Sequence, residues 1–195
     1  MYTLARIVVG PIYRTMFRFR VTGRENIPKD GAIILCANHR SYHDTLVMAL
    51  ACPRDLHFMA KSEIFKGRFF IWLFTSLGAI PVNRAKPGMD TLKRAVKILQ
   101  GGKALALFMQ GGRRAELNTN EYKAGVALFA IKGRALVVPV NIKSDFRLFS
   151  KVFINIGEPI SFEEYYDKKL RTEELNEAAQ KVMDEIVKLG PELEL

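Results

Sequence analysis

Hydrophobic and polar positions along the chain follow two different periods. Apolar residues at every second position, or in short unbroken runs, predict strands near residues 17–21, 32–38, 56–60, 79–82, 103–109, 135–142 and 153–156. Apolar residues at every third or fourth position predict helices near residues 1–16, 42–51, 68–77, 88–100, 121–133 and 172–189. Because the strands alternate with helices, we expect one α/β domain with a largely parallel mixed sheet flanked by helices.

The first predicted helix combines apolar and basic residues. Residues 1–16 mix apolar side chains with Arg6 and Arg14, and two more arginines follow at positions 18 and 20. A basic amphipathic helix suits an anionic bilayer surface, where each basic residue contributes about 1 kcal/mol. The alternative is a helix that packs on the domain. We expect residues 1–16 to associate with a membrane and residues 17–195 to form the single α/β domain.

Length and composition limit the class of protein. The chain has 195 residues, of which 49% are hydrophobic, which fits one domain with a sizeable core. No apolar run reaches the ~18 residues of a membrane-spanning helix, and Arg6 interrupts the apolar N-terminus where a signal peptide would need an unbroken core. Cys36 and Cys52 lie in apolar contexts, as reduced buried thiols do. We therefore expect peripheral attachment at the cytoplasmic face of a membrane.

The charge is uneven along the chain. The formal net charge is +10, although the segment after Phe162 is rich in glutamate and aspartate, so the preceding body is more basic than the total suggests. A basic body can attract nucleic acid, an anionic membrane or a phosphorylated substrate. Charge alone does not choose among these partners.

The most informative segment is the end of the second predicted strand. An apolar run over residues 33–37 leads into Asn38-His39, and Asp44 follows five residues after the histidine. An imidazole held by a carboxylate is the commonest general base in enzymes. The two side chains can meet if His39 lies in the turn before a helix and Asp44 in its first turn, at the strand end where α/β active sites lie. We expect His39 and Asp44 to be catalytic.

The same segment has a purely structural interpretation. Ser41 is a reasonable N-cap, and an acidic residue such as Asp44 in the first turn is favoured by the helix dipole. His43 and His57 are further imidazoles that the spacing alone does not exclude.

Segments elsewhere strengthen the catalytic interpretation. The predicted strand at 79–82 is followed by Arg84, and the strand at 103–109 by two glycines and two arginines, including Arg113. Glycines let backbone N–H groups approach an oxyanion, and arginine offers a planar donor fork to phosphate. A strand with an internal proline follows at Val138-Pro139-Val140.

Taken in this order, the segments resemble the glycerolipid acyltransferase family, and most closely the bacterial 1-acyl-glycerol-3-phosphate acyltransferases. That family carries N-H-x-x-x-x-D, then G-x-I-x-V-x-R, then F-P-E-G-T-R, then V-P-V. The matching residues here are 38–44, 78–84, 108–113 and 138–140, so that the resemblance runs from about residue 20 to 160. Lys61 and Lys123 also look like family positions.

The resemblance implies acyl transfer from acyl-CoA or acyl-carrier protein to the sn-2 hydroxyl of 1-acyl-glycerol-3-phosphate, giving phosphatidic acid in phospholipid biosynthesis. It implies that His39 removes the hydroxyl proton and that Asp44 orients the imidazole. The implied phosphate-binding residues are Arg84, Arg113 and Lys123. The implied acceptor-binding or oxyanion loop is Gln110, Gly111 and Gly112.

The loop around residues 109–112 departs from the family motif F-P-E-G-T-R. Met109 stands where the family has proline, Gln110 where it has glutamate, and Gly112 where it has threonine. Glutamine keeps the size and hydrogen-bonding capacity of glutamate and removes its negative charge. The departure leaves a second hypothesis open, in which the fold and chemistry are the same and the acceptor is a different lysolipid.

The expected partners are a lysophospholipid, an acyl thioester and an anionic membrane surface, with acyl-carrier protein as one donor. No metal-ligand cluster, G-x-S-x-G or Walker motif is apparent, so that we expect no cofactor besides the thioester co-substrate, and no nucleic acid. A basic lipid-binding or nucleic-acid-binding protein without catalysis is the remaining alternative. The aromatic residues between positions 65 and 74 line an acyl groove, lie against lipid, or belong to the core.

Overall fold

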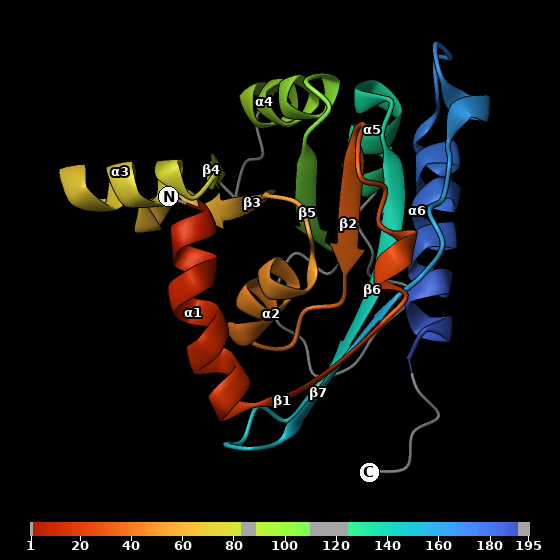
Figure 1. Ribbon diagram of the computed structural model, residues 1–195. Helices are drawn as coiled ribbons and strands as arrows, with labels where there is room; N and C mark the ends of the chain where they lie inside the picture. The colour runs from red at the N-terminus through yellow and green to blue at the C-terminus, as the bar shows by residue number, and fades with distance from the viewer. Residues whose placement is uncertain (1, 83–88, 110–124, 191–195) are drawn as a thin grey trace.

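A computed structural model describes residues 2–82, 89–109 and 125–190, and it confirms the predicted α/β class (Figure 1). The strands are β1 (Arg18–Thr22), β2 (Ile33–Ala37), β3 (Leu56–Lys61), β4 (Ile80–Val82), β5 (Ala104–Phe108), β6 (Leu136–Lys143) and β7 (Lys151–Ile156). The helices are α1 (Tyr2–Met16), α2 (His43–Ala51), α3 (Gly67–Ser76), α4 (Met89–Gln100), α5 (Gly125–Gly133) and α6 (Thr172–Lys188). Each predicted element is present, although residues 121–124 of the fifth predicted helix lie outside the described residues.

The strands form one sheet in the order β1-β7-β6-β2-β5-β3-β4. All neighbouring strands run parallel except β6 and β7, which are antiparallel. Strand β1 pairs with β7, so that the first and last strands of the chain lie side by side (Figure 1). The sheet is therefore mixed and largely parallel, as the sequence predicts.

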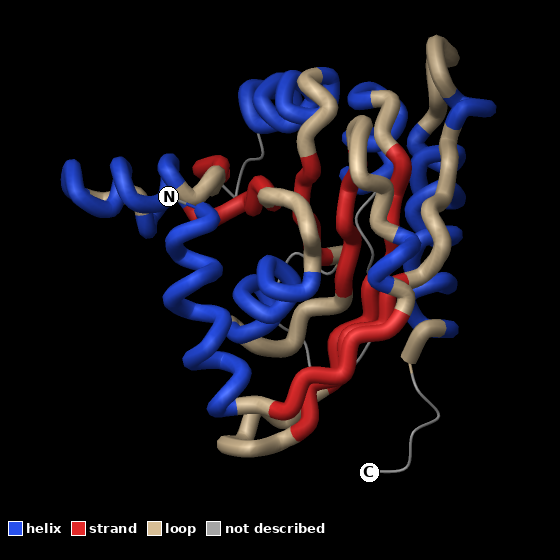
Figure 2. The backbone as a smooth tube through the Cα atoms, in the orientation of Figure 1, coloured by secondary structure: helices blue, strands red, loops and turns tan. Residues whose placement is uncertain are grey.

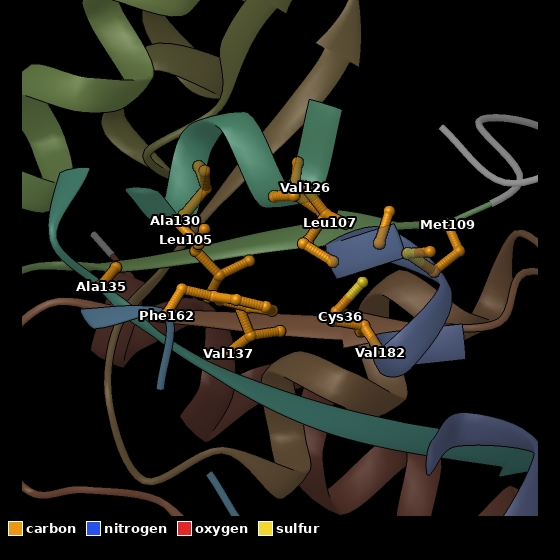
Figure 3. Packing of buried hydrophobic residues seen from close by; sticks show 14 of the residues in the cluster. Cys36, Leu105, Leu107, Met109, Val126, Ala130, Ala135, Val137, Phe162 and Val182 are labelled. Atoms are coloured by element: carbon orange, nitrogen blue, oxygen red, sulfur yellow. The ribbon is translucent and has the colours of Figure 1, made fainter. Parts of the chain in front are cut away.

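Strand β2 is central because its unbroken apolar run can be buried on both faces. Ile33, Leu35 and Ala37 belong to a cluster with residues of α1 and α2. Ile34 and Cys36 point to the opposite face, into a cluster with residues of α4, α5 and α6. Figure 3 shows this second cluster, with Cys36 among Leu107, Met109 and Val182. The result is three layers, with helices on both faces of the sheet.

The sheet divides on one side of its centre. Strand β3 pairs with β5 from Leu56 to Phe58, and from Met59 to Lys61 it pairs with β4 instead. Beyond Phe58, the backbones of β3 and β5 are therefore no longer hydrogen-bonded neighbours. This division, which we call the fork of the sheet, opens towards the carboxyl ends of the strands.

The N-terminal helix packs on the domain and also leaves an apolar face exposed. Gly10 and Tyr13 of α1 are buried, and Arg6 Nη2 donates a 2.8 Å hydrogen bond to the Cys52 carbonyl at the end of α2. The guanidinium of Arg6 therefore caps α2, which agrees with the alternative of a helix that packs on the domain. The exposed large apolar residues of α1 are Leu4, Ile7, Val8 and Ile12. Among the described residues, no helix combines the length and hydrophobicity that crossing a membrane requires.

Helices α4 and α5 touch at a glycine, which gives a test of the packing. A Cβ added at Gly133 would lie 2.7 Å from Leu99 Cβ, whereas one added at Gly125 of the same helix would meet nothing closer than 3.7 Å. We predict that Gly133→Ala lowers the free energy of unfolding by about 1–3 kcal/mol through overpacking. Gly125→Ala is the matched control and raises that free energy by up to about 1 kcal/mol. Urea denaturation measures both, and equal effects would contradict the predicted packing.

Candidate active site

The carboxyl end of β2 is fixed from both sides. On the side of β5, Met109 N donates a 3.0 Å hydrogen bond to the Ala37 carbonyl. On the side of β6, the Asn38 amide replaces a strand residue: its Nδ2 donates to the Ile142 carbonyl at 2.8 Å, and its Oδ1 accepts from Ile142 N at 2.7 Å. Because these bonds are buried, the turn that follows β2 starts from a fixed position. Figure 2 shows the backbone of this turn as a loop between the strand and the helix α2.

His39 and Asp44 meet across this turn. His39 Nδ1 lies 2.9 Å from Asp44 Oδ2, and the carboxylate is almost completely buried. The same oxygen accepts 2.7 Å hydrogen bonds from the backbone N–H groups of Arg40 and Ser41. A carboxylate only accepts, so that Nδ1 carries the proton and the basic lone pair of the neutral ring is on Nε2. The predicted contact is present, and its geometry suits a general base.

Phe108 stacks on the imidazole of His39. The ring centroids lie 4.0 Å apart with an interplanar angle of 17°. The stack follows from the pairing of β2 with β5, which sets Phe108 opposite Ala37, two residues before the histidine. An aromatic face favours a cation above it, so this ring stabilises the imidazolium more than the neutral imidazole. Sequence reasoning gave Phe108 no role, because the contact depends on the register of the two strands.

The interpretation of Ser41 and Asp44 as residues that support the start of a helix is also correct in part. Helix α2 begins at His43, whose N–H donates to Ser41 Oγ at 3.2 Å, and Asp44 lies in the first turn. Asp44 therefore supports both the start of the helix and the imidazole. His43 is held elsewhere, with its Nδ1 2.8 Å from the Tyr13 hydroxyl and its ring stacked on Phe146.

A cavity of about 780 Å³ adjoins His39. This volume falls within the range usual for small-molecule sites, about 300–1,000 Å³. His39 is the one histidine of three that lines it; His57 instead makes a 3.3 Å contact with the Ala104 carbonyl. Burial of the His57 ring lowers its pKa. The lining is mainly apolar, and its described polar members are Tyr2, Arg6, His39, Tyr42, Thr45, Lys61 and Thr91.

The cavity lies at the fork of the sheet. One wall is the end of β5 with Met109, and another is the outer half of β3 from Phe58 to Lys61. Helices α1, α2, α3 and α5 also contribute residues. Because the strands separate there, the cavity reaches residues from both layers of helices, including Leu50 of α2 and Val126 of α5. The periodic pattern of the sequence carries no signal for this separation.

The aromatic segment around α3 divides between two environments. Phe74 lines the cavity, together with Leu77 just after the helix. Phe69, Phe70 and Trp72 are exposed, and no residue of α3 is buried. The interpretation of this helix as ordinary core is therefore wrong.

Cys36 lies on the lining of the cavity and is fully buried. Burial raises the pKa of its thiol far above the usual range for cysteine. Since the thiolate is the nucleophilic form, this cysteine is unsuited to carry an acyl group. Among the described residues, no group of three or more His, Cys, Asp or Glu side chains could hold a metal ion.

Several predicted site residues lie outside the described residues. They are Arg84, Gln110, Gly111, Gly112, Arg113 and Lys123. Their roles therefore stay predictions. The strand ends that precede these residues in the chain do reach the cavity, because Val82 at the end of β4 and Met109 just after β5 both line it. Lys61 does so too, with its ammonium 3.1 Å from the Glu63 carboxylate.

Fold and site together define a class of protein: an α/β protein with a carboxylate-oriented histidine at the carboxyl end of its central strand and a large apolar cavity beside it. A family model described as acyltransferase matches residues 18–143. The chain belongs to this acyltransferase family.

Individual relatives agree with the family. The chain is 31% identical over 176 residues to a 1-acyl-sn-glycerol-3-phosphate acyltransferase of Streptococcus pneumoniae, which covers 86% of this chain and 64% of that protein. A Bacillus subtilis protein of the same name is 29% identical, over 72% of this chain and 73% of the relative. The crystal structure of the 1-acyl-sn-glycerophosphate acyltransferase PlsC from Thermotoga maritima matches with a TM-score of 0.69 and 25% identity, over 91% of this chain and 74% of that one.

The anchoring of the turn by Asn38 can be tested through stability. We predict that Asn38→Ala lowers the free energy of unfolding by about 1–3 kcal/mol, because it leaves the buried N–H and C=O groups of Ile142 without these partners. Gln180→Ala is the control. It removes an exposed side-chain hydrogen bond to Asp184 and costs about 0.2–0.5 kcal/mol. Urea denaturation compares the two, and a small loss for Asn38→Ala would contradict the anchoring role.

Proposed function

We propose that this protein transfers a fatty acyl group from a thioester to the sn-2 hydroxyl of 1-acyl-glycerol-3-phosphate and so makes phosphatidic acid for phospholipid biosynthesis. The observation that carries the proposal is the His39–Asp44 pair on the wall of a large apolar cavity. The names of the relatives support the same reaction. Acyl-CoA and acyl-carrier protein are both suitable donors, and no cofactor besides the thioester is needed.

The chemistry follows from the imidazole. Nε2 of His39 takes the proton of the acceptor hydroxyl while the hydroxyl oxygen attacks the thioester carbonyl. A tetrahedral oxyanion forms. When the oxyanion collapses, the carbon–sulfur bond breaks and the thiolate receives the proton from the imidazolium. The ester and a free thiol are the products, and His39 returns to its neutral form. No acyl-enzyme is required.

Asp44 and Phe108 act through the histidine. The carboxylate of Asp44 fixes the tautomer with the proton on Nδ1 and stabilises the imidazolium that forms during attack. The aromatic face of Phe108 favours the same cation. Both groups therefore lower the free energy of the charged state relative to the neutral one.

The cavity is the proposed site of the fatty acyl chain. Its lining from β5, α3 and α5 is apolar, and it begins beside the reacting histidine. An acyl chain that enters it leaves water, which contributes about 0.8 kcal/mol for each buried CH₂ group. The carbonyl carbon of the thioester then lies at the end nearest His39.

The phosphate of the acceptor is assigned to Arg84, Arg113 and Lys123, and the glycerol hydroxyls or the oxyanion to Gln110, Gly111 and Gly112, on the basis of the family motifs alone. Arginine binds phosphate in a bidentate way, and backbone N–H groups beside glycine can approach an oxyanion closely.

We also propose peripheral attachment to an anionic membrane at the cytoplasmic face. The exposed apolar residues of α1 recur at positions 4, 7, 8 and 12, which is one face of a helix, and α1 contains no acidic residue. Such a face would hold the protein where lysophospholipid substrates reside.

The departure at Gln110 favours a second candidate acceptor. If the family glutamate contacts the glycerol headgroup, glutamine with its neutral amide would bind a headgroup with a different pattern of hydrogen-bond donors and acceptors. A panel of lysophosphatidate, other lysophospholipids and lyso-ornithine lipid, each with acyl-CoA and with acyl-carrier protein, would identify the acceptor and donor. Formation of phosphatidic acid, detected by mass spectrometry, tests the first proposal; its absence with every donor contradicts it.

Replacing the base should remove the activity and leave the fold. We predict that His39→Gln lowers kcat by roughly 10²–10⁴-fold, because proton transfer contributes about that much. Asp44→Asn should lower kcat with a smaller change in KM, since it removes the charge that stabilises the imidazolium.

The matched control for these variants is His57→Gln, because His57 does not line the cavity. We expect it to keep the activity of the wild-type protein. Circular dichroism would confirm that all three variants are folded. Full activity in His39→Gln would rule out the proposed mechanism.

Arg113→Ala tests the phosphate role. Loss of a guanidinium that binds the acceptor phosphate should raise the KM for lysophosphatidate by roughly tenfold or more, because charge-assisted hydrogen bonds contribute about 1.5–3 kcal/mol. The KM for the acyl donor should change much less. Arg171→Ala, at the start of α6 outside the motif blocks, is the control. Equal changes for acceptor and donor would exclude a specific role in phosphate binding.

A further inference from the structure

Helix α3 exposes more apolar surface than packing within this protein accounts for. Phe69, Phe70, Ile71 and Trp72 are consecutive, and their exposed fractions are 63%, 49%, 48% and 54%. No residue of the helix is buried. Contiguous apolar patches of this kind on a soluble surface mark sites of interaction with a partner or a membrane.

The cavity uses only one side of the helix. Phe74 lines the cavity, whereas Phe69, Phe70 and Trp72 do not. The exposed aromatic rings contact one another: Phe69 lies 5.4 Å from Phe70 and 6.1 Å from Trp72, measured between ring centroids. Phe70 in turn stacks on Phe74 of the cavity lining, with 6.0 Å between the ring centroids. The exposed rings therefore form a preassembled cluster on the outside of α3, which in Figure 1 extends away from the β3–β4 edge of the sheet.

The charges around this cluster favour an anionic partner. Helix α3 contains no acidic residue, and the exposed side chains of Lys66 and Arg68 lie at its start. Helix α1 also lacks acidic residues and exposes Arg14. An apolar helix face beside basic side chains is typical of contact with an anionic bilayer surface, and aromatic rings favour the interfacial region of such a bilayer.

We propose that α3 is a second bilayer-contact element, whose Phe69, Phe70, Ile71 and Trp72 enter the interface of an anionic membrane beside the exposed face of α1. The proposal rests on the proposed function for the nature of the partner, a phospholipid bilayer. Two contacts restrict the orientation of a protein on a surface more than a single helix does.

The position of the cavity agrees with this arrangement. Ala5 and Val9 of α1 and Phe74 of α3 line the same cavity. A bilayer that contacts the outer faces of both helices lies against the elements that bound the proposed acyl site. An acyl chain could then pass from the bilayer into the cavity along apolar surface.

The chain provides its own probe, because Trp72 is its single tryptophan. We would add vesicles of equal parts phosphatidylglycerol and phosphatidylcholine to the wild-type protein, without substrate, and record its tryptophan emission. We expect a blue shift, and quenching when the lipids carry bromine atoms on their acyl chains. Emission that stays unshifted and unquenched while the protein sediments with the vesicles would overturn the proposal.

A variant pair measures the contribution of the cluster to binding. Phe69→Glu should weaken sedimentation with these vesicles by about tenfold or more, since it replaces an aromatic ring that leaves water on binding by a charged group. Val187→Glu is the matched control: it adds the same negative charge at an exposed apolar position of α6, and binding should be unchanged. Equal losses in the two variants would mean that added negative charge alone weakens binding, and would overturn the role of the cluster.

A second copy of the chain is the competing occupant. If the aromatic cluster covers itself by self-association, the blue shift would appear on raising the protein concentration without vesicles, and sedimentation equilibrium would show a dimer; that result would overturn the bilayer proposal. Acyl transfer by the wild-type protein with detergent-dispersed lysophosphatidate is measured separately. Failure there would count against the proposed function and would leave the fluorescence result standing, so that the two can fail independently.

Discussion

The buried carboxylate of Asp44 is the constraint on which the site depends. A charge removed from water is strongly unfavourable unless hydrogen bonds replace its hydration. One oxygen of Asp44 accepts from the N–H groups of Arg40 and Ser41 and from the His39 ring. The turn, the beginning of α2 and the tautomer of the histidine therefore satisfy one requirement together. That arrangement needs a fixed starting point, which Asn38 provides by binding Ile142 with both ends of its amide.

The fork of the sheet gives the domain an open apolar space beside its closely packed core. Strands β2, β5, β6 and β7 carry much of the buried core, and close packing there leaves little room for a ligand. Where β3 changes its partner from β5 to β4, the sheet opens and an apolar space begins beside His39. The reacting group is thus attached to the central, fully buried strand, while the apolar space lies against the strand that leaves the sheet.

The sequence predicts the elements well because each has a strong local pattern. The apolar run of β2 and the five-residue spacing of His39 and Asp44 were enough to place His39 in the turn before α2 and Asp44 in its first turn, where they lie. The contacts that sequence reasoning missed are all between distant segments. The stack of Phe108 on His39 needs the register of β2 with β5, the cavity needs the change of partner in β3, and the hydrogen bond from Arg6 to the end of α2 needs the packing of α1. Local periodicity contains no information about strand order, so these features require the tertiary structure.

The hydrogen bond from Arg6 to Cys52 has a mechanical consequence. It joins the first turns of α1 to the last carbonyl groups of α2, and the opposite end of α2 carries Asp44. Tyr13 of α1 makes a second contact with α2, because its hydroxyl lies 2.8 Å from His43 Nδ1. The helix with the exposed apolar face is therefore joined to both ends of the helix that holds Asp44, and loss of Arg6 would leave only the second of these two contacts, at the Asp44 end.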